Sequence, residues 1–322
     1  MKISSWLLTI FLMLVLPAHA QTFPDRPITL IVPFAAGGGA DAFGRLVAQY
    51  MSGPLHQPVV VENIGGAGGT LGAARGARAQ PDGYTITLTG LGYVASATLY
   101  RKLPYDPIEA FEAIGMIGEV PMAIVGPKNA PAKDIVELIS QIKNKTEGVT
   151  MAHGGIGSAS HLCGMLLMSG LNARMSVVPY KSAAPALNDV VGGRIDVLCD
   201  QTASTISQIK GGSVKGFAVT TRARLAAIQE LPALSESGIP GFELGVWSGL
   251  HAPKGTPKPV VDRLASALKV AIADPAFVRR LDELGAQVMD KELSEPAQFD
   301  KFMRDEIAKW RRMITENGTY AD

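Results

Sequence analysis

The chain has 322 residues, with 30 Lys and Arg against 29 Asp and Glu and a formal net charge of +1 at pH 7. This balance gives no general attraction to nucleic acid or to an anionic membrane surface, so we expect neither as a partner, and any preference for anions must be local. The length is enough for two modest domains that each bury a hydrophobic core.

The N-terminus has the pattern of a secretory signal peptide over residues 1–20. Lys2 precedes an apolar run from Trp6 to Leu16, and Ala18-His19-Ala20 supplies a small-x-small cleavage site. The apolar run is too short to span a bilayer, no Cys follows the site to accept a lipid anchor, and no later stretch reaches transmembrane length. We therefore expect a soluble protein that is exported and cleaved after Ala20.

The first predicted strand, Ile28 to Phe34, runs into the turn Gly37-Gly38-Gly39, and a helix follows at Asp41. Glycines let a ligand come close to the backbone amides. The free N–H groups of the first helical turn then favour a carboxylate or phosphate without a basic side chain. We expect Asp41 to cap this helix. Taken alone, the pattern fits an ordinary strand-to-helix turn equally well.

A second strand, Pro58 to Asn63, leads into Gly65-Gly66-Ala67-Gly68-Gly69 and an alanine-rich helix from Ala73 to Ala79. A dinucleotide-binding loop would need glycine where Leu71 stands, and an exported protein rarely meets NAD. The phosphate-binding motif G-x-x-x-x-G-K-[ST] does not occur either. We expect no cofactor.

A third glycine turn, Gly154-Gly155-Ile156-Gly157, precedes a helix that carries Ser158 and His161. An exported serine hydrolase could use these two side chains. However, Ile156 and Ser160 stand where the G-x-S-x-G elbow requires glycine, and the sequence shows no acid that would orient His161. A capping and ligand-contact role is favoured, and the hydrolase is kept as the alternative.

Side chains that bind metals or form disulfides are few. The remaining histidines are scattered, and neither H-E-x-x-H nor a cysteine-histidine cluster occurs, so we expect no metal site. Cys163 and Cys199 allow one disulfide, which an exported protein could form. Two buried free thiols fit the sequence equally well.

Short β-rich runs alternate with helical patterns over the first two thirds of the chain, which indicates βαβ units and parallel sheets. The expected strands are Ile28–Phe34, Pro58–Asn63, Tyr84–Thr89, Val149–Ala152, Val177–Tyr180, Ile195–Cys199 and Lys215–Thr221. Apolar stripes at helical spacing then predict helices over 260–272, 277–284 and 299–314, with a break at Asp274-Pro275. We expect these stripes to pack in the core.

The glycine turns all follow strands, and open α/β sheets bind their ligands at that end. If the turns at 37–41 and 154–161 belong to different lobes, closure of one lobe on the other brings two helix N-termini onto one small ligand. The sequence therefore predicts an α/β binding receptor.

Over essentially the whole mature chain, the sequence resembles the Bug-type periplasmic receptors, the solute-binding subunits of tripartite tricarboxylate transporters. Several landmarks in the same order carry this resemblance. They are Phe23-Pro24-Asp25-Arg26-Pro27-Ile28, Pro33-Phe34 with Gly37-Gly38-x-x-Asp41, Val61-x-Asn63 with Gly66-Ala67-Gly68-Gly69, Leu103-Pro104-Tyr105-Asp106-Pro107, Gly155-x-Gly157-Ser158-x-x-His161, Val178-Pro179-Tyr180-Lys181, Gly192-Gly193-Arg194-Ile195-Asp196 and Trp247-Ser248-Gly249-Leu250-His251-Ala252-Pro253.

The resemblance implies a type II periplasmic-binding-protein fold, in which each of two lobes is a mixed, mostly parallel sheet flanked by helices. Two crossing strands would join the lobes, near Met122 to Gly126 and near Trp247 to Ala252. Lobe 1 would then comprise residues 21–122 and 248–322, and lobe 2 would comprise residues 123–247.

The resemblance also implies a ligand carboxylate held by backbone amides, small hydroxyls and water. The implied binding residues are Phe34, Ala35, Gly38, Gly39 and Asp41 from one lobe and Gly157, Ser158 and His161 from the other, with Thr89, Gly90 and Asp200 as further candidates. Asp200 could equally be a helix or turn cap. Ser182 stands where the family often has Gly, and Lys181 could be a ligand cation or a solvated surface lysine.

The function that the resemblance implies is capture of a small organic carboxylate in the periplasm, without enzymatic chemistry, and its delivery to integral-membrane transporter subunits. The protein would act as a monomer. A carboxylate sensor that serves a signalling partner is an alternative. Phe34 favours an aromatic carboxylate or dicarboxylate such as terephthalate, and citrate-like or C4 acids are further possibilities.

Overall fold

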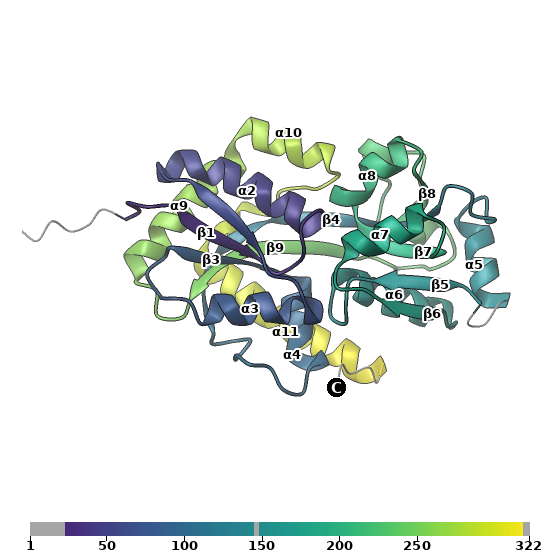
Figure 1. Ribbon diagram of the computed structural model, residues 1–322, viewed down its shortest axis with the longest axis horizontal. Helices are drawn as coiled ribbons and strands as arrows, with labels where there is room; N and C mark the ends of the chain where they lie inside the picture. Colours follow the sequence, from purple (N-terminus) through teal and green to yellow (C-terminus); the bar gives the residue numbers. More distant parts are fainter. Residues whose placement is uncertain (1–22, 145–147, 318–322) are drawn as a thin grey trace, which may run out of the picture.

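The computed structural model describes residues 23–144 and 148–317, so the predicted signal peptide and the cleavage site after Ala20 lie outside the described residues. The described part is a mixed α/β structure in which two sheets share one long strand (Figure 1). This arrangement confirms the predicted α/β fold class.

The first sheet has the strand order β2-β1-β3-β9-β4. Its strands are β1 (Ile28–Val32), β2 (Val59–Asn63), β3 (Thr85–Gly90), β9 (Gly245–Pro253) and the first part of β4 (Phe111–Pro127). β1 is parallel to β2 and β3, whereas β9 is antiparallel to β3 and β4. β1 ends before the predicted Phe34, because Pro33 has no N–H to donate to a neighbouring strand.

The second sheet has the strand order β8-β4-β7-β5-β6. Its other strands are β5 (Thr150–His153), β6 (Ser176–Pro179), β7 (Val197–Gln201) and β8 (Val214–Val219). β5 is parallel to β6 and β7, and β4 is antiparallel to β7 and β8. All seven strands predicted before residue 222 are therefore present, with ends that differ by one or two residues.

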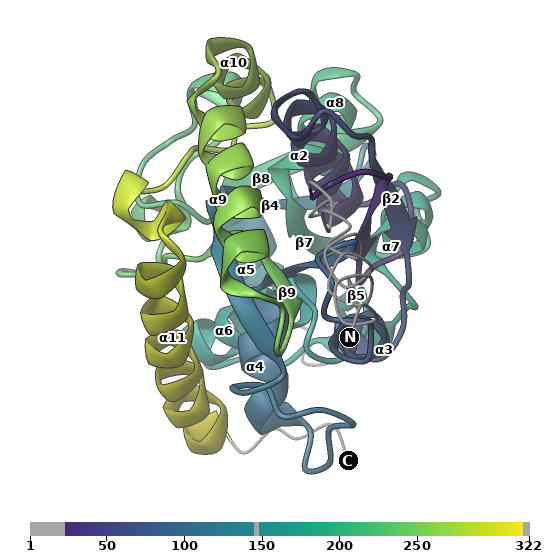
Figure 2. The same cartoon turned by 90° about the vertical axis from the view of Figure 1, so that its left-hand side faces the viewer.

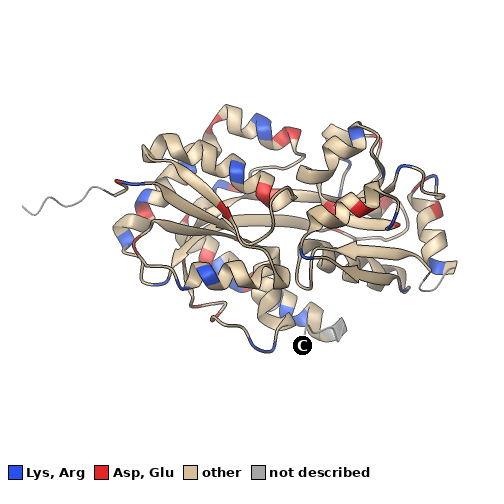
Figure 3. Cartoon of the chain, in the orientation of Figure 1, with Lys and Arg blue, Asp and Glu red and all other residues tan. Residues whose placement is uncertain are grey.

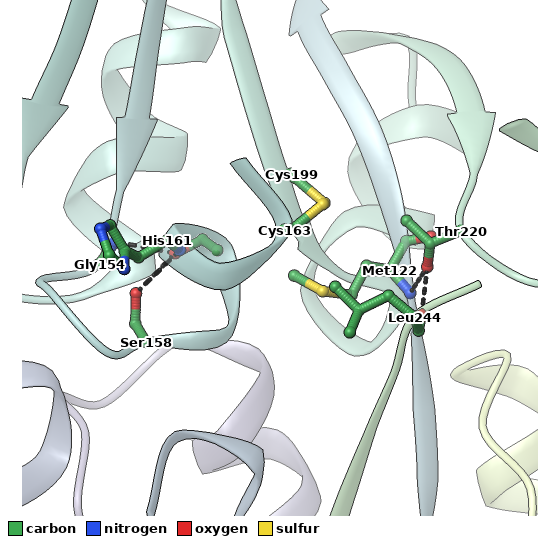
Figure 4. Close-up of a disulfide and its surroundings, with 9 residues drawn as sticks. Met122, Gly154, Ser158, His161, Cys163, Cys199, Thr220 and Leu244 are labelled. Carbon is green, nitrogen blue, oxygen red and sulfur yellow. Dashed lines mark hydrogen bonds between the residues drawn. A yellow bond between two sulfur atoms is a disulfide. The ribbon is translucent and has the colours of Figure 1, made fainter. Parts of the chain in front are cut away.

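The chain crosses between the sheets twice. β4 pairs with β9 as far as Pro121 and with β7 from Met122 onward. The return lies between Val219 and Gly245, where Thr220 Oγ1 donates to the Leu244 carbonyl (2.6 Å) and accepts from the Met122 N–H (3.0 Å; Figure 4). The second crossing thus precedes the predicted segment 247–252, all of which pairs within the first sheet.

We call residues 23–121 and 245–317 the first side of the molecule, and residues 122–244 the second side. The lobe boundaries at 122 and 248 stay a prediction.

Helices cover both faces of the first sheet (Figures 1 and 2). On one face lie α2 (Gly39–Leu55), α9 (Lys258–Ala273) and α10 (Pro275–Glu283), and on the other lie α3 (Thr70–Ala77), α4 (Leu91–Leu99) and α11 (Pro296–Asn317). Phe277 and Phe299 are fully buried, as the predicted stripes require, whereas Val278 is exposed. Asp274 separates α9 from α10 by accepting the Ala276 N–H (2.7 Å).

The second sheet carries four α-helices: α5 (Ile135–Asn144), α6 (Ala159–Leu171), α7 (Ala183–Val191) and α8 (Thr202–Lys210). The described chain also contains the 3₁₀ turns η2 (Ala67–Gly69), η3 (Ala226–Ile228), η4 (Leu234–Glu236) and η5 (Lys291–Ser294). A disulfide joins Cys163 of α6 to Cys199 of β7, with Cα atoms 6.2 Å apart (Figure 4). Of the two alternatives that the sequence left open, a disulfide or two buried free thiols, the structure has the disulfide.

Charged residues of both signs are interspersed along the described chain (Figure 3). Within residues 23–144 and 148–317, no helix is both long and apolar enough to cross a membrane.

Candidate ligand-binding site

Six helices begin at one cavity between the two sides of the molecule. The cavity measures about 80 Å³, enough for several waters, since one water needs about 10–15 Å³. Its lining includes the N-cap residues of α2, α3 and α4 from the first side and of α6, α7 and α8 from the second. These N-caps are Gly38, Gly69, Gly90, Ser158, Ser182 and Gln201.

The helix N-termini give this cavity its electrostatic character. Each one presents first-turn N–H groups and the positive end of a helix dipole, both of which favour an anion. Among the six N-caps only Ser158 forms a side-chain cap, by accepting the His161 N–H at 3.3 Å. Among the described residues, the lining contains no Lys, Arg or His. The cavity can therefore stabilise a carboxylate with backbone donors alone.

The first-side loop before α2 is held by Asp41, which lies behind the cavity lining. The N-cap is Gly38, so the prediction that Asp41 caps this helix is wrong. Its carboxylate instead accepts the Gly37 N–H (2.9 Å), Arg45 Nε (3.1 Å) and Asn63 Nδ2 (2.9 Å). Burial raises the pKa of Asp41, but these hydrogen bonds outweigh it and the pKa lies below its ordinary value. Phe34, Ala35, Gly38 and Gly39 line the cavity in front of it.

The second-side loop before α6 has an equivalent support. His161 Nδ1 accepts the Gly157 N–H at 3.3 Å, and the His161 ring packs against the His153 ring with centroids 4.8 Å apart. Burial and His153 lower the pKa of His161 to about 4, so the ring is neutral at pH 7. Of the three residues predicted here, Ser158 lines the cavity, whereas Gly157 and His161 stand behind it.

The contacts of Ser158 do not form a catalytic triad. The Ser158 hydroxyl lies 3.0 Å from the Ser160 hydroxyl and accepts the His161 backbone N–H (Figure 4). Because the His161 ring faces the Gly157 N–H and His153, it does not take the position of a base for Ser158. The geometry gives no support to the hydrolase alternative.

Thr89 and Gly90 line the cavity at the end of β3, and His251 of β9 lies behind Thr89. His251 Nδ1 is 2.6 Å from Thr89 Oγ1, and burial lowers the pKa of His251 to about 3. The buried Nε2 has no partner. A buried N–H without a partner is rarer than a buried acceptor without one, so we assign the ring proton to Nδ1. His251 then donates to Thr89, and the Thr89 hydroxyl proton is available to an acceptor in the cavity.

Asp200 lines the cavity at the end of β7 and is 4% exposed. One of its oxygens accepts from Ser204 Oγ at 2.7 Å, and burial raises the pKa of Asp200 to about 6. Tyr93 and Tyr105 also line the cavity, and burial raises the pKa values of both phenols, that of Tyr105 to about 12. Among the described lining residues, Asp200 is thus the one side chain that ionises near neutral pH.

Several lining residues were not predicted. Gly68, Gly69 and Thr70 lie at the second glycine turn, which the sequence places at the ligand end of a strand without naming a binding residue in it. Ser182, seen only as a departure from the family pattern, is an N-cap whose buried hydroxyl has no partner. Lys181 is exposed and does not line the cavity.

The two sides touch around the cavity. Tyr100 of the first side donates its hydroxyl to the Ile156 carbonyl of the second side (2.9 Å). A Cβ on Gly68 would overlap that same carbonyl, and a Cβ on Gly39 would overlap the Gln201 side chain. The absence of side chains at these glycines therefore allows the close approach of the two sides.

Residues 43–319 match the tripartite tricarboxylate transporter family receptor, TctC. The chain belongs to this family. It is a periplasmic solute-binding receptor of the TctC and Bug type, a family of binding proteins rather than enzymes, as its motifs indicated.

Solved structures of similar receptors have the same fold. The periplasmic binding protein BugD is 43% identical, with a TM-score of 0.89 over 92% of this chain and 99% of that one. MatC from Rhodopseudomonas palustris, solved with bound malate, is 36% identical, with a TM-score of 0.86 over 91% and 100% of the two chains. Rpa4515 of R. palustris, solved with adipate, is 30% identical, with a TM-score of 0.87 over 92% and 99%.

No group of three or more His, Cys, Asp or Glu side chains with the geometry of a metal site occurs within the described ranges.

Proposed function

We propose that this receptor captures a small organic carboxylate in the periplasm and delivers it to the membrane subunits of a tripartite tricarboxylate transporter. The observation that carries the proposal is the convergence of six helix N-termini on a cavity whose lining, among the described residues, has no basic side chain. Export with cleavage after Ala20 and action as a monomer are parts of the same proposal.

The ligand carboxylate is bound by the N–H groups of two facing loops. Gly38 and Gly39 at the start of α2 and Ser158 at the start of α6 contact it, while Asp41 and His161 hold those loops in place. A micromolar Kd corresponds to about −8 kcal/mol. A few charge-assisted hydrogen bonds, each contributing about 1.5–3 kcal/mol, can supply this after the ordering costs.

We propose an aliphatic dicarboxylate as the ligand, ahead of the aromatic acid that Phe34 suggested. Two similar receptors were solved with the aliphatic diacids malate and adipate. Phe34 forms one apolar wall, which either ligand class could contact.

Calorimetric titration of the ligand-free mature protein tests this function. Malate, succinate, adipate, citrate and terephthalate form the panel. One-to-one binding of at least one acid with a Kd in the micromolar range or below is expected, and aliphatic acids should bind more tightly than terephthalate. Failure of every acid to bind folded, ligand-free protein would overturn the proposal.

A second measurement separates transport from sensing. Deletion of the receptor gene should abolish uptake of the labelled acid by whole cells. Unchanged uptake together with altered transcription would favour the sensor alternative.

A further inference from the structure

Asp200 is chemically unusual in this cavity because it places a carboxylate where the rest of the lining favours an anion. Among the described residues it forms no ion pair, and its hydrogen bonds from Ser204 Oγ and from the Gln201 backbone N–H satisfy part of its acceptor capacity. A carboxylate has room for about four hydrogen bonds. A buried carboxylate without a cation is costly, so partners for the remaining acceptor positions would be strongly favoured.

Two contacts at the start of α8 favour the ionised form of Asp200, although its burial opposes ionisation. They are the hydrogen bonds from Ser204 Oγ and from the backbone N–H of Gln201, the N-cap residue of α8. The Asp200 pKa of about 6 means that the carboxylate form predominates at pH 8. The cavity thus holds one fixed negative charge within an otherwise positive field.

A ligand that brings only carboxylate oxygens to Asp200 would place two acceptors and two like charges together. A hydroxyl or ammonium group removes that conflict, since it donates a hydrogen bond to Asp200 while the carboxylates remain at the helix N-termini.

We infer that the ligand of this cavity is a carboxylic acid that carries a hydroxyl or ammonium donor, and that this donor binds the carboxylate of Asp200. The inference rests on the proposed function and narrows its ligand class to hydroxy acids and amino acids.

The test compares three four-carbon diacids that differ at one carbon. Succinate carries hydrogen there, malate a hydroxyl and L-aspartate an ammonium group, and adipate serves as a longer diacid without a donor. Calorimetry at pH 8 should give at least one of malate and L-aspartate a Kd about 10- to 100-fold below those of succinate and adipate, the range expected for a hydrogen bond to a charged group. The order of malate and L-aspartate identifies the donor.

Asp200→Asn tests the residue. The variant should weaken binding of the preferred acid about 10-fold or more, because the donor of that acid loses its charged acceptor. Succinate has no donor for Asp200, and Asn adds an N–H₂ group that can donate to a carboxylate, so succinate binding should not weaken. Asp305→Asn, the same change at a 67% exposed carboxylate on α11, should alter neither. If the Asp200 variant does not fold, the ligand ranking on the unaltered protein still decides.

The possible outcomes distinguish failure of the inference from failure of the proposed function. Tight binding of succinate or adipate that equals or exceeds that of both donor-bearing acids overturns the inference and leaves the proposed function intact. Equal weakening of all acids by Asp200→Asn shows that Asp200 only supports the fold of the site, and also overturns the inference. Absence of binding by any acid overturns the proposed function and the inference together.

Discussion

The loops at the starts of α2 and α6 have one backbone design and two different chemical supports. In each, a glycine with positive φ precedes the N-cap, Gly37 (φ 86°) in one and Gly157 (φ 87°) in the other. In each, the N–H of that glycine donates to the side chain four residues later. The φ of these glycines lies in the region that L side chains rarely adopt.

The two supporting side chains, Asp41 and His161, differ in charge and in the other groups that they contact. Asp41 is an ionised carboxylate that also accepts hydrogen bonds from Arg45 and Asn63, whereas His161 is a neutral imidazole beside His153. The disulfide through Cys163 braces α6 but not α2. The loop geometry therefore needs only a buried acceptor at this position, and the contribution of each support to stability depends on its other hydrogen-bond partners.

Removal of the Asp41 carboxylate should have the largest effect on this comparison. Asp41→Ala leaves the Gly37 N–H, Asn63 and Arg45 without their acceptor, so we expect the free energy of unfolding to fall by about 2–4 kcal/mol and ligand affinity to fall with it. Urea unfolding measures the loss. Asp262→Ala, which removes an exposed carboxylate paired with Lys258, should cost less than about 1 kcal/mol. Equal losses in the two variants would show that the carboxylate does not support the loop.

Loss of the Thr89 hydroxyl should have the next largest effect. Thr89 lines the cavity, and the buried side chain of His251 supports it in the way that Asp41 and His161 support the two loops. Thr89→Val leaves His251 Nδ1 unpartnered, and we expect a loss of about 1–3 kcal/mol in stability and about 10-fold in ligand affinity. Thr87→Val is the matched control on β3, because the buried Thr87 hydroxyl has no partner and does not line the cavity. It should leave affinity unchanged. A weaker response at Thr89 than at Thr87 would show that the Thr89–His251 hydrogen bond does not support the site.

The His161 support should have the smallest effect and the clearest dependence on pH. His161→Asn keeps a side-chain acceptor at this position, so we expect a loss of about 1 kcal/mol in the free energy of unfolding at pH 8. The unfolded histidine takes up a proton near pH 6.5, whereas the folded one does so near pH 4. Between these values the proton therefore favours the unfolded chain, and stability falls as pH falls.

Urea unfolding at pH 8 and pH 5 measures this contribution. The variant should lose less stability than the unaltered protein over that interval, although His153 and His251, whose pKa values are also lowered by burial, still contribute. An identical loss in both proteins would show that the pKa of His161 is not lowered by folding.

The loops and caps of the site could be predicted from sequence. Which of their residues line the cavity and which lie behind the lining could not. Glycines after β1 and β5 and the hydroxyl of Ser158 were recognised because turn and cap chemistry acts within a few residues. Which side chain stands in front of a loop and which behind it depends on distant packing. For that reason Asp41, Gly157 and His161 were expected to contact the ligand, although none of them lines the cavity.

The order of apolar, glycine and helical segments determined the α/β class, the position of nearly every strand and the C-terminal helices, because hydrophobic periodicity and glycine turns are local properties. The family could be identified from motif order alone. Only the tertiary structure decided that six helix N-termini meet at one cavity, that His251 lies behind Thr89, and that Asp200 brings a carboxylate into that cavity. These arrangements join residues up to 162 positions apart, and the pairing of β4, β7 and β9 brings them together.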